Sequence, residues 1–360
     1  MIAFVVNGDA ESAMGDRARA FAARLPAEWR PVVLYRTGSR AAAIAHFTGA
    51  LGRIRPTTVY VLDMALSGVV AAALRRVVRG TRFIVDTGDA VTALARSSGG
   101  RGPLAIAATA ALEGLGTRLA AHLVVRGSAH RELLATRGRA STVIPDGVDL
   151  ALFHPVDAAA ARARLGFGEE LVVTVLGSSV WNPRLRMAYG WDLVEALGLL
   201  RGLPVRGLVI GDGTGIAALA ERARELGVLD RLVLSGRQKL AALPELLCAS
   251  DVCLSTQTND IVGQVRTTGK LPLYLACGRF VLASAVGEAA RVLPPEMLLD
   301  YRSAGRDDDY PARLAERLRA LIDRRDELAR PARSVAIARE HFDYDRLAAR
   351  MREVLRTHAS

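Results

Sequence analysis

The chain has 360 residues and a formal net charge of +11, with 51% hydrophobic and 24% charged residues, which excludes a disordered protein and allows two domains with apolar cores. No stretch reaches about 18 uninterrupted apolar residues, and the first residues are too short a run for a signal peptide. Cys248, Cys253 and Cys277 lack metal-site spacing, so we expect buried thiols in a protein of the reducing cytoplasm.

The first half of the sequence alternates short apolar runs with helical patterns. The expected strands are 1–6, 31–36, 57–63, 82–89, 122–127 and 141–149, and the expected helices lie near 11–25, 39–52, 66–79 and 104–121. Continuously apolar strands between helices indicate a parallel sheet that is covered on both faces. Right-handed crossovers then predict a doubly wound α/β fold.

The second half repeats this alternation after a linker, residues 145–170, that shows no periodic pattern. The expected strands lie in 171–177, 205–215 (with a glycine turn at its end), 231–239 (with a basic loop at its end), 251–256, 280–283 and 297–301. The expected helices lie near 187–202, 216–227, 240–249, 308–329 and 343–357. We predict two Rossmann-like domains, residues 1–155 and 156–342, with helix 343–358 packing back on the first. A cleft between such domains is a favoured ligand site.

The stretch from Thr267 to Pro294 carries the strongest functional pattern. Lys270 stands where a helix begins, Gly278 ends that helix, and Gly287 opens the next one after an apolar strand. Helix starts beside a strand end, together with a lysine, suit a diphosphate. The chain has only two lysines, Lys239 and Lys270, so Lys270 stands out among the arginines. An ordinary αβα unit with a capping lysine is the alternative interpretation.

Polar residues also follow the expected strands of the first half. They are Asn7, Gly8, Asp9, Asp63, Asp86, Thr87, Gly88, Asp89, Arg126 and Gly127. In doubly wound sheets, ligands bind at the carboxyl ends of the strands. Gly8 has no GxGxxG companion, so a dinucleotide fingerprint is absent. Glycines, arginines and aspartates at such loops favour a phosphorylated small molecule as the ligand.

Five segments resemble GT-B retaining glycosyltransferases of family 4 when they are taken in order. The hinge of that family is similar to VIPDGVDLALFHP, and its glycine turn and base-binding loop are similar to VIGDGTGIAALAERARELGVLDRLVLSGR. Its donor-site core is similar to SDVCLSTQ and KLPLYLACGRFVLASAVGE, and its closing helix to REHFDYDRLAARMREVL. The resemblance covers most of 120–358, is weaker over 1–120, and implies the GT-B fold.

The resemblance implies roles for individual residues. Those implied to contact the donor are Lys270, Arg184, Arg186, Gly8, Gly211, Gly213, Arg237, Thr268 and Gly287. Asp89, or with less support Asp86, lies where the family places a polar catalytic residue near the reacting carbon, and Lys270 and Arg184 would neutralise the leaving diphosphate. The structural alternatives are that the two aspartates cap helices and that the arginines lie on solvated loops.

One feature departs from the family pattern. The family carries two glutamates with seven residues between them, the second of which holds the nucleotide ribose, and these positions fall on Val265 and Leu273. Neither side chain accepts a hydrogen bond. Glu288, directly after Gly287, is the expected substitute. Without such a substitute, the chain belongs to a divergent subgroup with unusual donor recognition, or it has lost activity.

The resemblance implies a retaining, metal-independent hexosyltransferase that moves a sugar from a nucleotide-diphosphate sugar to a hydroxyl acceptor, and this is the leading hypothesis. The acceptor is a polysaccharide or lipid-linked precursor, as in polysaccharide biosynthesis, or a small metabolite. The alternatives are a non-catalytic glycosyltransferase-like binding or partner protein and a GT-B-type nucleotide-sugar epimerase.

The charge distribution bears on the partners. Residues 1–156 hold 19 basic and 11 acidic residues, a net +8, whereas the remainder holds 29 and 26, a net +3. A basic first half favours an anionic acceptor or peripheral contact with the inner face of a membrane. A codon bias toward arginine explains the same excess without a partner. Aromatic residues are not interleaved with the basic ones, so no nucleic-acid partner is expected.

Overall fold

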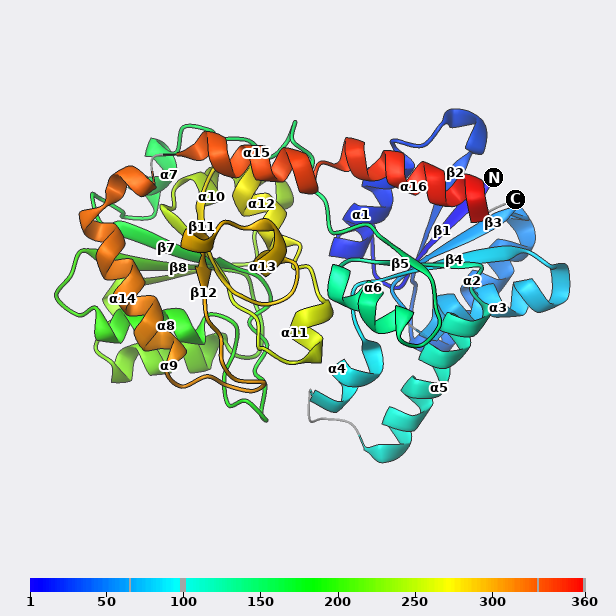
Figure 1. Ribbon diagram of the computed structural model, residues 1–360, viewed down its shortest axis with the longest axis horizontal. Coiled ribbons are helices and arrows are strands. Elements are labelled where there is room, and N and C mark those ends of the chain that lie inside the picture. The colour runs from blue at the N-terminus through cyan, green and yellow to red at the C-terminus, as the bar shows by residue number, and fades with distance from the viewer. Residues whose placement is uncertain (65, 98–101, 329, 359–360) are drawn as a thin grey trace. The chain divides into compact units, whose positions relative to one another are not determined.

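The computed structural model describes residues 1–64, 66–97, 102–328 and 330–358 (Figure 1). The chain forms two compact units. Unit 1 comprises Met1–Gly147, the short segment Gln264–Thr267, and the chain from Asp343 onward; unit 2 comprises Val148–Gly263 and Thr268–Phe342. Each unit contains one six-stranded parallel sheet.

Unit 1 is built on a sheet with the strand order β2-β1-β3-β4-β5-β6. The strands are β1 (Ile2–Val6), β2 (Pro31–Tyr35), β3 (Thr58–Leu62), β4 (Arg82–Thr87), β5 (His122–Val125) and β6 (Ser141–Val143). The helices are α1 (Ala13–Ala22), α2 (Arg40–Ile54), α3 (Leu66–Arg79), α4 (Val91–Ser97), α5 (Pro103–Leu119), α6 (Ser128–Ala135) and α16 (Tyr344–His358).

Two apolar clusters cover the two faces of this sheet. On one face, α2, α3 and α6 bury side chains such as Phe47 and Leu134 against β1, β3, β4 and β5. On the other face, α1 and α16 contribute Phe21, Leu347 and Met351. The alternation of side chains along each strand supplies both clusters, because consecutive residues of a strand point to opposite faces. The chain thus returns from unit 2 to complete the core of unit 1 with α16.

Unit 2 has the strand order β12-β11-β10-β7-β8-β9, the arrangement of a Rossmann fold. Its strands are β7 (Leu171–Leu176), β8 (Val205–Ile210), β9 (Leu232–Gly236), β10 (Val252–Ser255), β11 (Phe280–Ser284) and β12 (Leu298–Leu299). Its helices are α7 (Ala159–Arg164), α8 (Trp191–Leu199), α9 (Ile216–Glu225), α10 (Leu243–Cys248), α12 (Lys270–Ala276), α13 (Ala289–Val292), α14 (Tyr310–Asp323) and α15 (Pro331–His341). The remaining helix, α11 (Ile261–Val265), runs into the segment that belongs to unit 1.

The structure confirms the two doubly wound sheets and most element positions, and it corrects several limits. Residues 145–170 were expected to lack a regular element, but they contain α7. The last strand is two residues long rather than five, and α8 begins at Trp191 rather than near 187. Within the described part of the chain, no helix is both long and apolar enough to cross a membrane.

The stretch around Lys270 folds as predicted. Lys270 is the first residue of α12, and Gly278 follows that helix with a φ of 69°, the left-handed conformation that glycine adopts without strain. β11 then runs from Phe280 to Ser284 and is fully buried. Gly287 has a φ of 60° and lies two residues before α13.

Candidate functional site

The sheet of unit 2 has a topological switch point between β7 and β10. From β7 the chain proceeds outward through β8 and β9, whereas β10, β11 and β12 extend in the other direction. The loops that follow β7 and β10 therefore leave the sheet in opposite directions. Such a point, at the carboxyl ends of parallel strands, is where ligands bind in open α/β sheets.

Lys270 lies at this switch point. Its Nζ atom is 3.3 Å from the centroid of the Tyr189 ring, a cation–π contact, and Tyr189 comes from the loop after β7. The Tyr189 hydroxyl donates a hydrogen bond to the carbonyl oxygen of Leu254 in β10, at 2.8 Å. The amide of Leu176, the last residue of β7, donates to the hydroxyl of Tyr274 in α12, at 2.7 Å. These contacts fix the start of α12 between the two strands.

The loops after β7 and β8 interlock through glycines. Gly211 has a φ of 140° and Gly213 a φ of 151°. A Cβ atom at Gly211 would overlap the carbonyl oxygen of Gly177, and one at Gly213 would lie 2.5 Å from the carbonyl carbon of Ser179. The amide of Ser179 donates to the carbonyl oxygen of Asp212 at 2.9 Å. Glycine is therefore required at both positions, because the two loops approach too closely to admit a side chain.

Arg184 and Arg186 are exposed on the loop between β7 and α8. The side chain of Asn182 accepts hydrogen bonds from the amides of Arg184 and Leu185, at 3.0 and 3.1 Å, and shapes this part of the loop. Arg186 itself has a φ of 52°. Arg237 is also exposed, but it follows β9, two strands away from β7. The structure thus puts the two loop arginines and Lys270 after neighbouring strands, and Arg237 farther along the same edge.

Thr268 and Glu288 lie on the other side of the switch point. The hydroxyls of Thr268 and Ser255 are 3.1 Å apart, which ties the segment two residues before α12 to the end of β10. Glu288 is partly exposed on the loop after β11 and immediately precedes α13. The two positions that lack glutamates are apolar and packed: Val265 is fully buried, and Leu273 packs against the core of unit 2.

The candidate residues of unit 1 lie at the carboxyl edge of its own sheet. Gly8 follows β1, and a side chain there would overlap the hydroxyl of Ser12, which caps α1 by accepting a hydrogen bond from the amide of Gly15. Asn7 accepts a hydrogen bond from the Ser67 hydroxyl at 2.7 Å and so joins the end of β1 to the start of α3. Gly8 is thus required to keep the first turn of α1 close to the strand.

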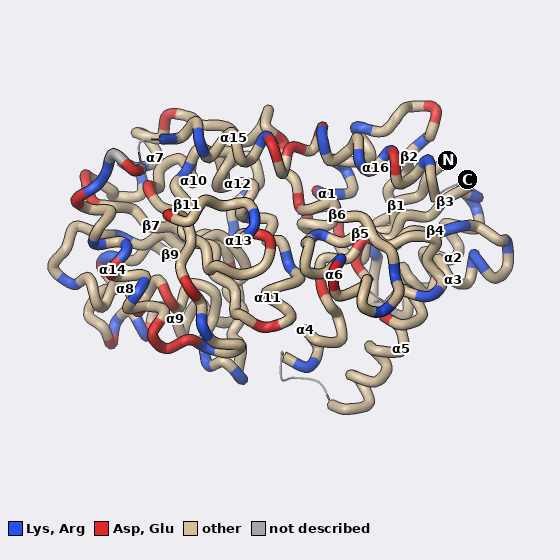
Figure 2. Tube along the Cα trace, viewed as in Figure 1, with Lys and Arg blue, Asp and Glu red and all other residues tan. Residues whose placement is uncertain are grey.

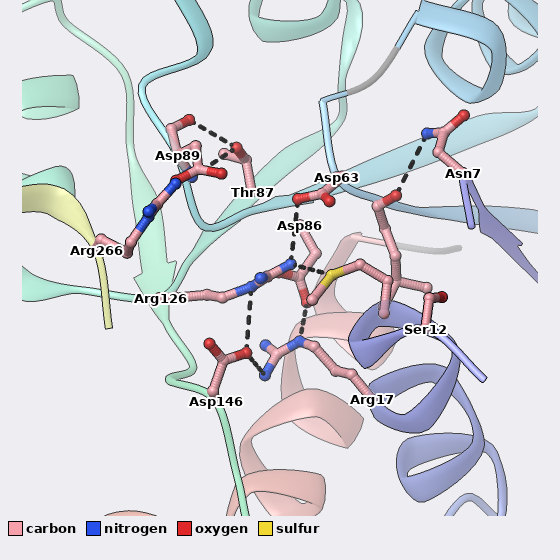
Figure 3. A network of polar contacts seen from close by, with 12 residues as sticks. Asn7, Ser12, Arg17, Asp63, Asp86, Thr87, Asp89, Arg126, Asp146 and Arg266 are labelled. Atoms are coloured by element: carbon pink, nitrogen blue, oxygen red, sulfur yellow. Dashed lines mark hydrogen bonds and ion pairs between the residues drawn. The ribbon is translucent and has the colours of Figure 1, made fainter. Parts of the chain in front are cut away.

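Asp86 lies in a buried network of charged side chains (Figure 3). Its carboxylate accepts hydrogen bonds from Arg17 and from the hydroxyl of Tyr60, each at 2.9 Å, and lies 3.4 Å from Arg126. Arg17 also donates to two backbone carbonyl oxygens at the end of β6. The expectation that Asp86 reaches a ligand or caps a helix is therefore corrected: its carboxylate is fully buried and compensates two buried arginines.

Asp89 has a different environment from Asp86. It lies on the loop after β4 with a side-chain exposure of 26%, and it accepts a hydrogen bond from Arg266 at 2.7 Å (Figure 3). Asp89 does not cap α4. The carboxylate of Glu113 accepts the hydrogen bonds of the Val91 and Thr92 amides, each at 3.1 Å. The helix-cap alternative for Asp89 is thus excluded, and its carboxylate is accessible from the carboxyl edge.

Arg126 lies among several carboxylates at this edge of the sheet, including that of Asp86. It lies 3.4 Å from Asp63 and 3.6 Å from Asp146. Burial disfavours its charge, but the surrounding carboxylates outweigh burial and raise the pKa of Arg126. Burial also raises the pKa of Asp63, and the positive charge of Arg126 opposes this shift. Asp63 has a φ of 66°, the left-handed conformation that aspartate adopts more readily than most residues other than glycine.

Sequence reasoning missed several of these residues. Arg17, Tyr60, Asp146, Arg266 and Glu113 were not identified as participants, and each acts through a partner remote in sequence. One signal was available for Arg17, since it precedes Ala18 and lies four residues before Phe21 on the apolar side of α1. A charged residue on a buried helix face requires a buried partner.

No metal centre is evident among the residues that the structure describes, since none of their His, Cys, Asp and Glu side chains form a group of three that could hold an ion. The structure has two candidate ligand-binding edges: a cationic, glycine-lined edge in unit 2 and a polar edge with carboxylates in unit 1. The first suits an anionic ligand, because a lysine and two exposed arginines follow adjacent strands. The second suits a hydroxyl-bearing ligand, because carboxylates accept hydrogen bonds.

The two parallel six-stranded sheets with their flanking helices form the GT-B fold. Anabaena HepE in complex with UDP-glucose matches with a TM-score of 0.79 and 16% identity over 99% of this chain and 100% of HepE. The sucrose-phosphate synthase of Thermosynechococcus elongatus matches with a TM-score of 0.79 and 16% identity over 99% of this chain and 98% of that protein. Anabaena HepE has also been solved in complex with UDP.

Two curated relatives are similar in sequence. The D-inositol 3-phosphate glycosyltransferase of Geodermatophilus obscurus is 32% identical over 215 residues, which are 58% of this chain and 45% of that protein. The enzyme of the same name from Xylanimonas cellulosilytica is 31% identical over 220 residues, which are 59% of this chain and 50% of that protein. The chain thus spans about half the length of these relatives. No family model matches it.

Proposed function

We propose that the chain is a glycosyltransferase that moves a hexosyl group from a nucleotide-diphosphate sugar to a hydroxyl acceptor, with retention of configuration and without a metal. The observation that carries the proposal is the position of Lys270 at the switch point of a GT-B fold, 3.3 Å from the Tyr189 ring centroid. The names of the curated relatives and the UDP and UDP-glucose complexes of a fold neighbour support it. UDP-sugars are therefore the first donors to test.

In this mechanism, Lys270 and the exposed Arg184 and Arg186 hold the diphosphate and stabilise its charge as the bond to the sugar breaks. The acceptor hydroxyl attacks the anomeric carbon from the face that the diphosphate leaves. The departing phosphate oxygen takes the hydroxyl proton, so no protein nucleophile is needed. Asp89 orients the acceptor hydroxyl, and the glycine turn at Gly211 keeps the loops of the donor site in place.

The acceptor is a polysaccharide or lipid-linked precursor or a small metabolite. Because the relatives are named for D-inositol 3-phosphate, a phosphorylated cyclitol is the first small acceptor to test. The site residues Gly213, Arg237, Thr268, Gly287 and Glu288 complete the proposed donor contacts. Glu288 replaces the missing glutamates as the acceptor of ribose hydrogen bonds, since Val265 and Leu273 cannot serve.

The test is a transfer assay with UDP-, GDP-, ADP- and TDP-sugars and a panel of acceptors. We expect nucleotide diphosphate release with one base, a product of unchanged anomeric configuration by NMR, and the same rate in the presence of EDTA. An inverted product or loss of activity with EDTA would contradict the mechanism.

A second candidate function is supported by the packing of two residues. Val265 is fully buried and the partly buried Leu273 packs against the core, so neither side chain offers a hydrogen-bond acceptor to a ribose hydroxyl. A chain that binds a nucleotide sugar without turnover would be a partner or binding protein. Nucleotide binding without product in any assay would favour this function.

A further inference from the structure

The last two turns of α3 expose an apolar stripe. Leu74 is 46% exposed, Val77 77% and Val78 69%. These residues are spaced at i, i+3 and i+4, so they lie on one face of the helix. The opposite side of α3 is buried against the sheet through residues such as Ala72 and Val69. Three large apolar side chains in one exposed stripe mark an interaction surface rather than scattered surface residues.

Arginines surround this stripe. Arg79 lies one helical turn after Arg75 on α3. Arg55 is the residue after α2, a helix that packs beside α3. Burial lowers the pKa of Arg75, and the positive charges of Arg79 and Arg55 lower it further, in agreement with their positions on these neighbouring helix ends. Figure 2 shows blue segments near the labels of α2 and α3.

The basic charge of the chain's first half is concentrated here. Residues 29–85 contain nine arginines and a single acidic residue, Asp63, giving a net +8. This equals the net +8 of residues 1–156 as a whole. Asp63 follows β3 at the carboxyl edge, whereas Arg55 and Arg79 precede β3 and β4 at the amino edge. The stripe and its arginines are therefore without a nearby compensating carboxylate in this stretch of sequence.

We propose that the end of α3, with Leu74, Val77 and Val78 flanked by Arg55, Arg75 and Arg79, docks unit 1 on an anionic lipid surface. The apolar side chains enter the boundary between headgroups and acyl chains, and the guanidinium groups pair with lipid phosphates. This placement of an apolar face beside basic residues is typical of peripheral membrane contacts. The proposal goes beyond the glycosyltransferase reaction and does not depend on it.

Two other occupants fit the observations less well. A second copy of the chain, related by a two-fold axis, would bring the arginines of both copies together, and like charges at close range oppose association. Nucleic acid would satisfy the arginines, but it offers nothing to three exposed aliphatic side chains. An anionic bilayer satisfies both features at once.

The test is co-sedimentation of the full chain with vesicles of phosphatidylcholine alone and of phosphatidylcholine with 30% phosphatidylglycerol. The wild type should bind the anionic vesicles and be released by high salt, because salt screens exposed charges. Arg75→Gln with Arg79→Gln should weaken partitioning by about fivefold for each arginine. Val77→Asp with Val78→Asp should weaken it at least as much.

Matched controls separate docking from general charge and fold effects. Arg346→Gln with Arg350→Gln removes an exposed i,i+4 arginine pair from α16, and Leu104→Asp with Leu199→Asp places two charges at exposed apolar positions elsewhere. Both controls should bind like the wild type, and all variants should keep the wild-type melting temperature within a few degrees.

Three results would overturn the proposal. The first is a wild type that does not bind anionic vesicles, and the second is equal loss of binding in the controls. The third is a concentration-dependent dimer in size-exclusion chromatography, or a duplex DNA complex, that the Val77→Asp and Val78→Asp variant abolishes while vesicle binding persists. That result would assign the surface to a second copy or to nucleic acid.

Discussion

The ammonium group of Lys270 lies 3.3 Å from the centroid of the Tyr189 ring, so the residue at the start of α12 is held by an aromatic side chain from the loop after β7. The Tyr189 hydroxyl is in turn fixed by the backbone of Leu254. A cation restrained in this way loses less conformational entropy when an anion binds. The contact thus preorganises the charge that the proposed donor site depends on.

The first prediction concerns this contact. Tyr189→Leu should weaken binding of a nucleotide diphosphate by about two- to thirtyfold, because a partly desolvated cation–π contact is worth about 0.5–2 kcal/mol. Tyr189→Phe keeps the ring and should bind within about twofold of the wild type. Calorimetric titration measures both. Equal losses in the two variants would instead assign the effect to the hydroxyl.

The second prediction concerns the glycine turn. Gly211→Ala should destabilise unit 2 by about 2 kcal/mol or more and abolish nucleotide binding, because the added Cβ overlaps Gly177 and the φ of 140° is unfavourable for alanine. Gly49→Ala is the control, since a Cβ there meets nothing within 4 Å and α2 should gain about 0.4–1 kcal/mol. Denaturant unfolding distinguishes the two. An unaffected Gly211→Ala would contradict the close approach of the loops.

The third prediction separates Asp86, in β4, from Asp89, on the loop that follows β4. Asp86→Asn should cost about 3–5 kcal/mol of unfolding free energy, because it removes the charge that compensates buried Arg17 and Arg126. Asp89→Asn should change stability by less than about 1 kcal/mol, since its ion pair is partly exposed, yet lower the rate of sugar transfer. Thermal unfolding and transfer rates measured together test both statements. A stable Asp86→Asn variant would refute the structural role.

The fourth prediction concerns pH and Asp192, a buried residue in the first turn of α8. Burial raises the pKa of Asp192 to about 7, Arg306 opposes the shift, and Asp307 and Glu195 add to it. Because the unfolded chain releases this proton near its ordinary pKa of 3.8, the contribution of Asp192 to stability is lost as pH rises from about 4 to 7.

Asp192→Asn should therefore raise the free energy of unfolding by up to about 4 kcal/mol at pH 8 and have little effect at pH 4. Melting temperatures measured across this range test the prediction. Asp230→Asn, at an exposed position, should show no such pH dependence. A variant that is equally destabilised at both pH values would show that the Asp192 carboxylate stabilises the fold in its charged form.

The fold was largely predictable because apolar strands and helix periods reflect burial directly. The runs that became β1, β3, β7 and β11 are buried along their length, and local signals such as Gly278 identified a helix end. The strand orders could not be read from the sequence, since every strand of a covered parallel sheet has the same apolar pattern. α7 was missed because its six residues are too short to show a helical period.

The site was only partly predictable. Lys270 and the glycine turn have local signals, a helix start and a strand-to-helix loop. The network around Asp86 has none, because Arg17, Tyr60 and Asp86 come together through pairings of residues as far as 69 positions apart in sequence. The same holds for Arg266 and Asp89, which are separated by 177 positions. Charge partners of this kind follow from tertiary structure and not from spacing.

The most direct test of the proposed donor site is calorimetric titration of UDP into the wild type, Lys270→Ala and Lys239→Ala. We expect the wild type and Lys239→Ala to bind alike and Lys270→Ala to bind at least about tenfold more weakly, the loss of one charge-assisted contact. If UDP fails to bind the wild type, the same titration with GDP, ADP and TDP should identify the base. Equal binding by Lys270→Ala, or no binding of any of these nucleotides, would contradict a donor site at the start of α12.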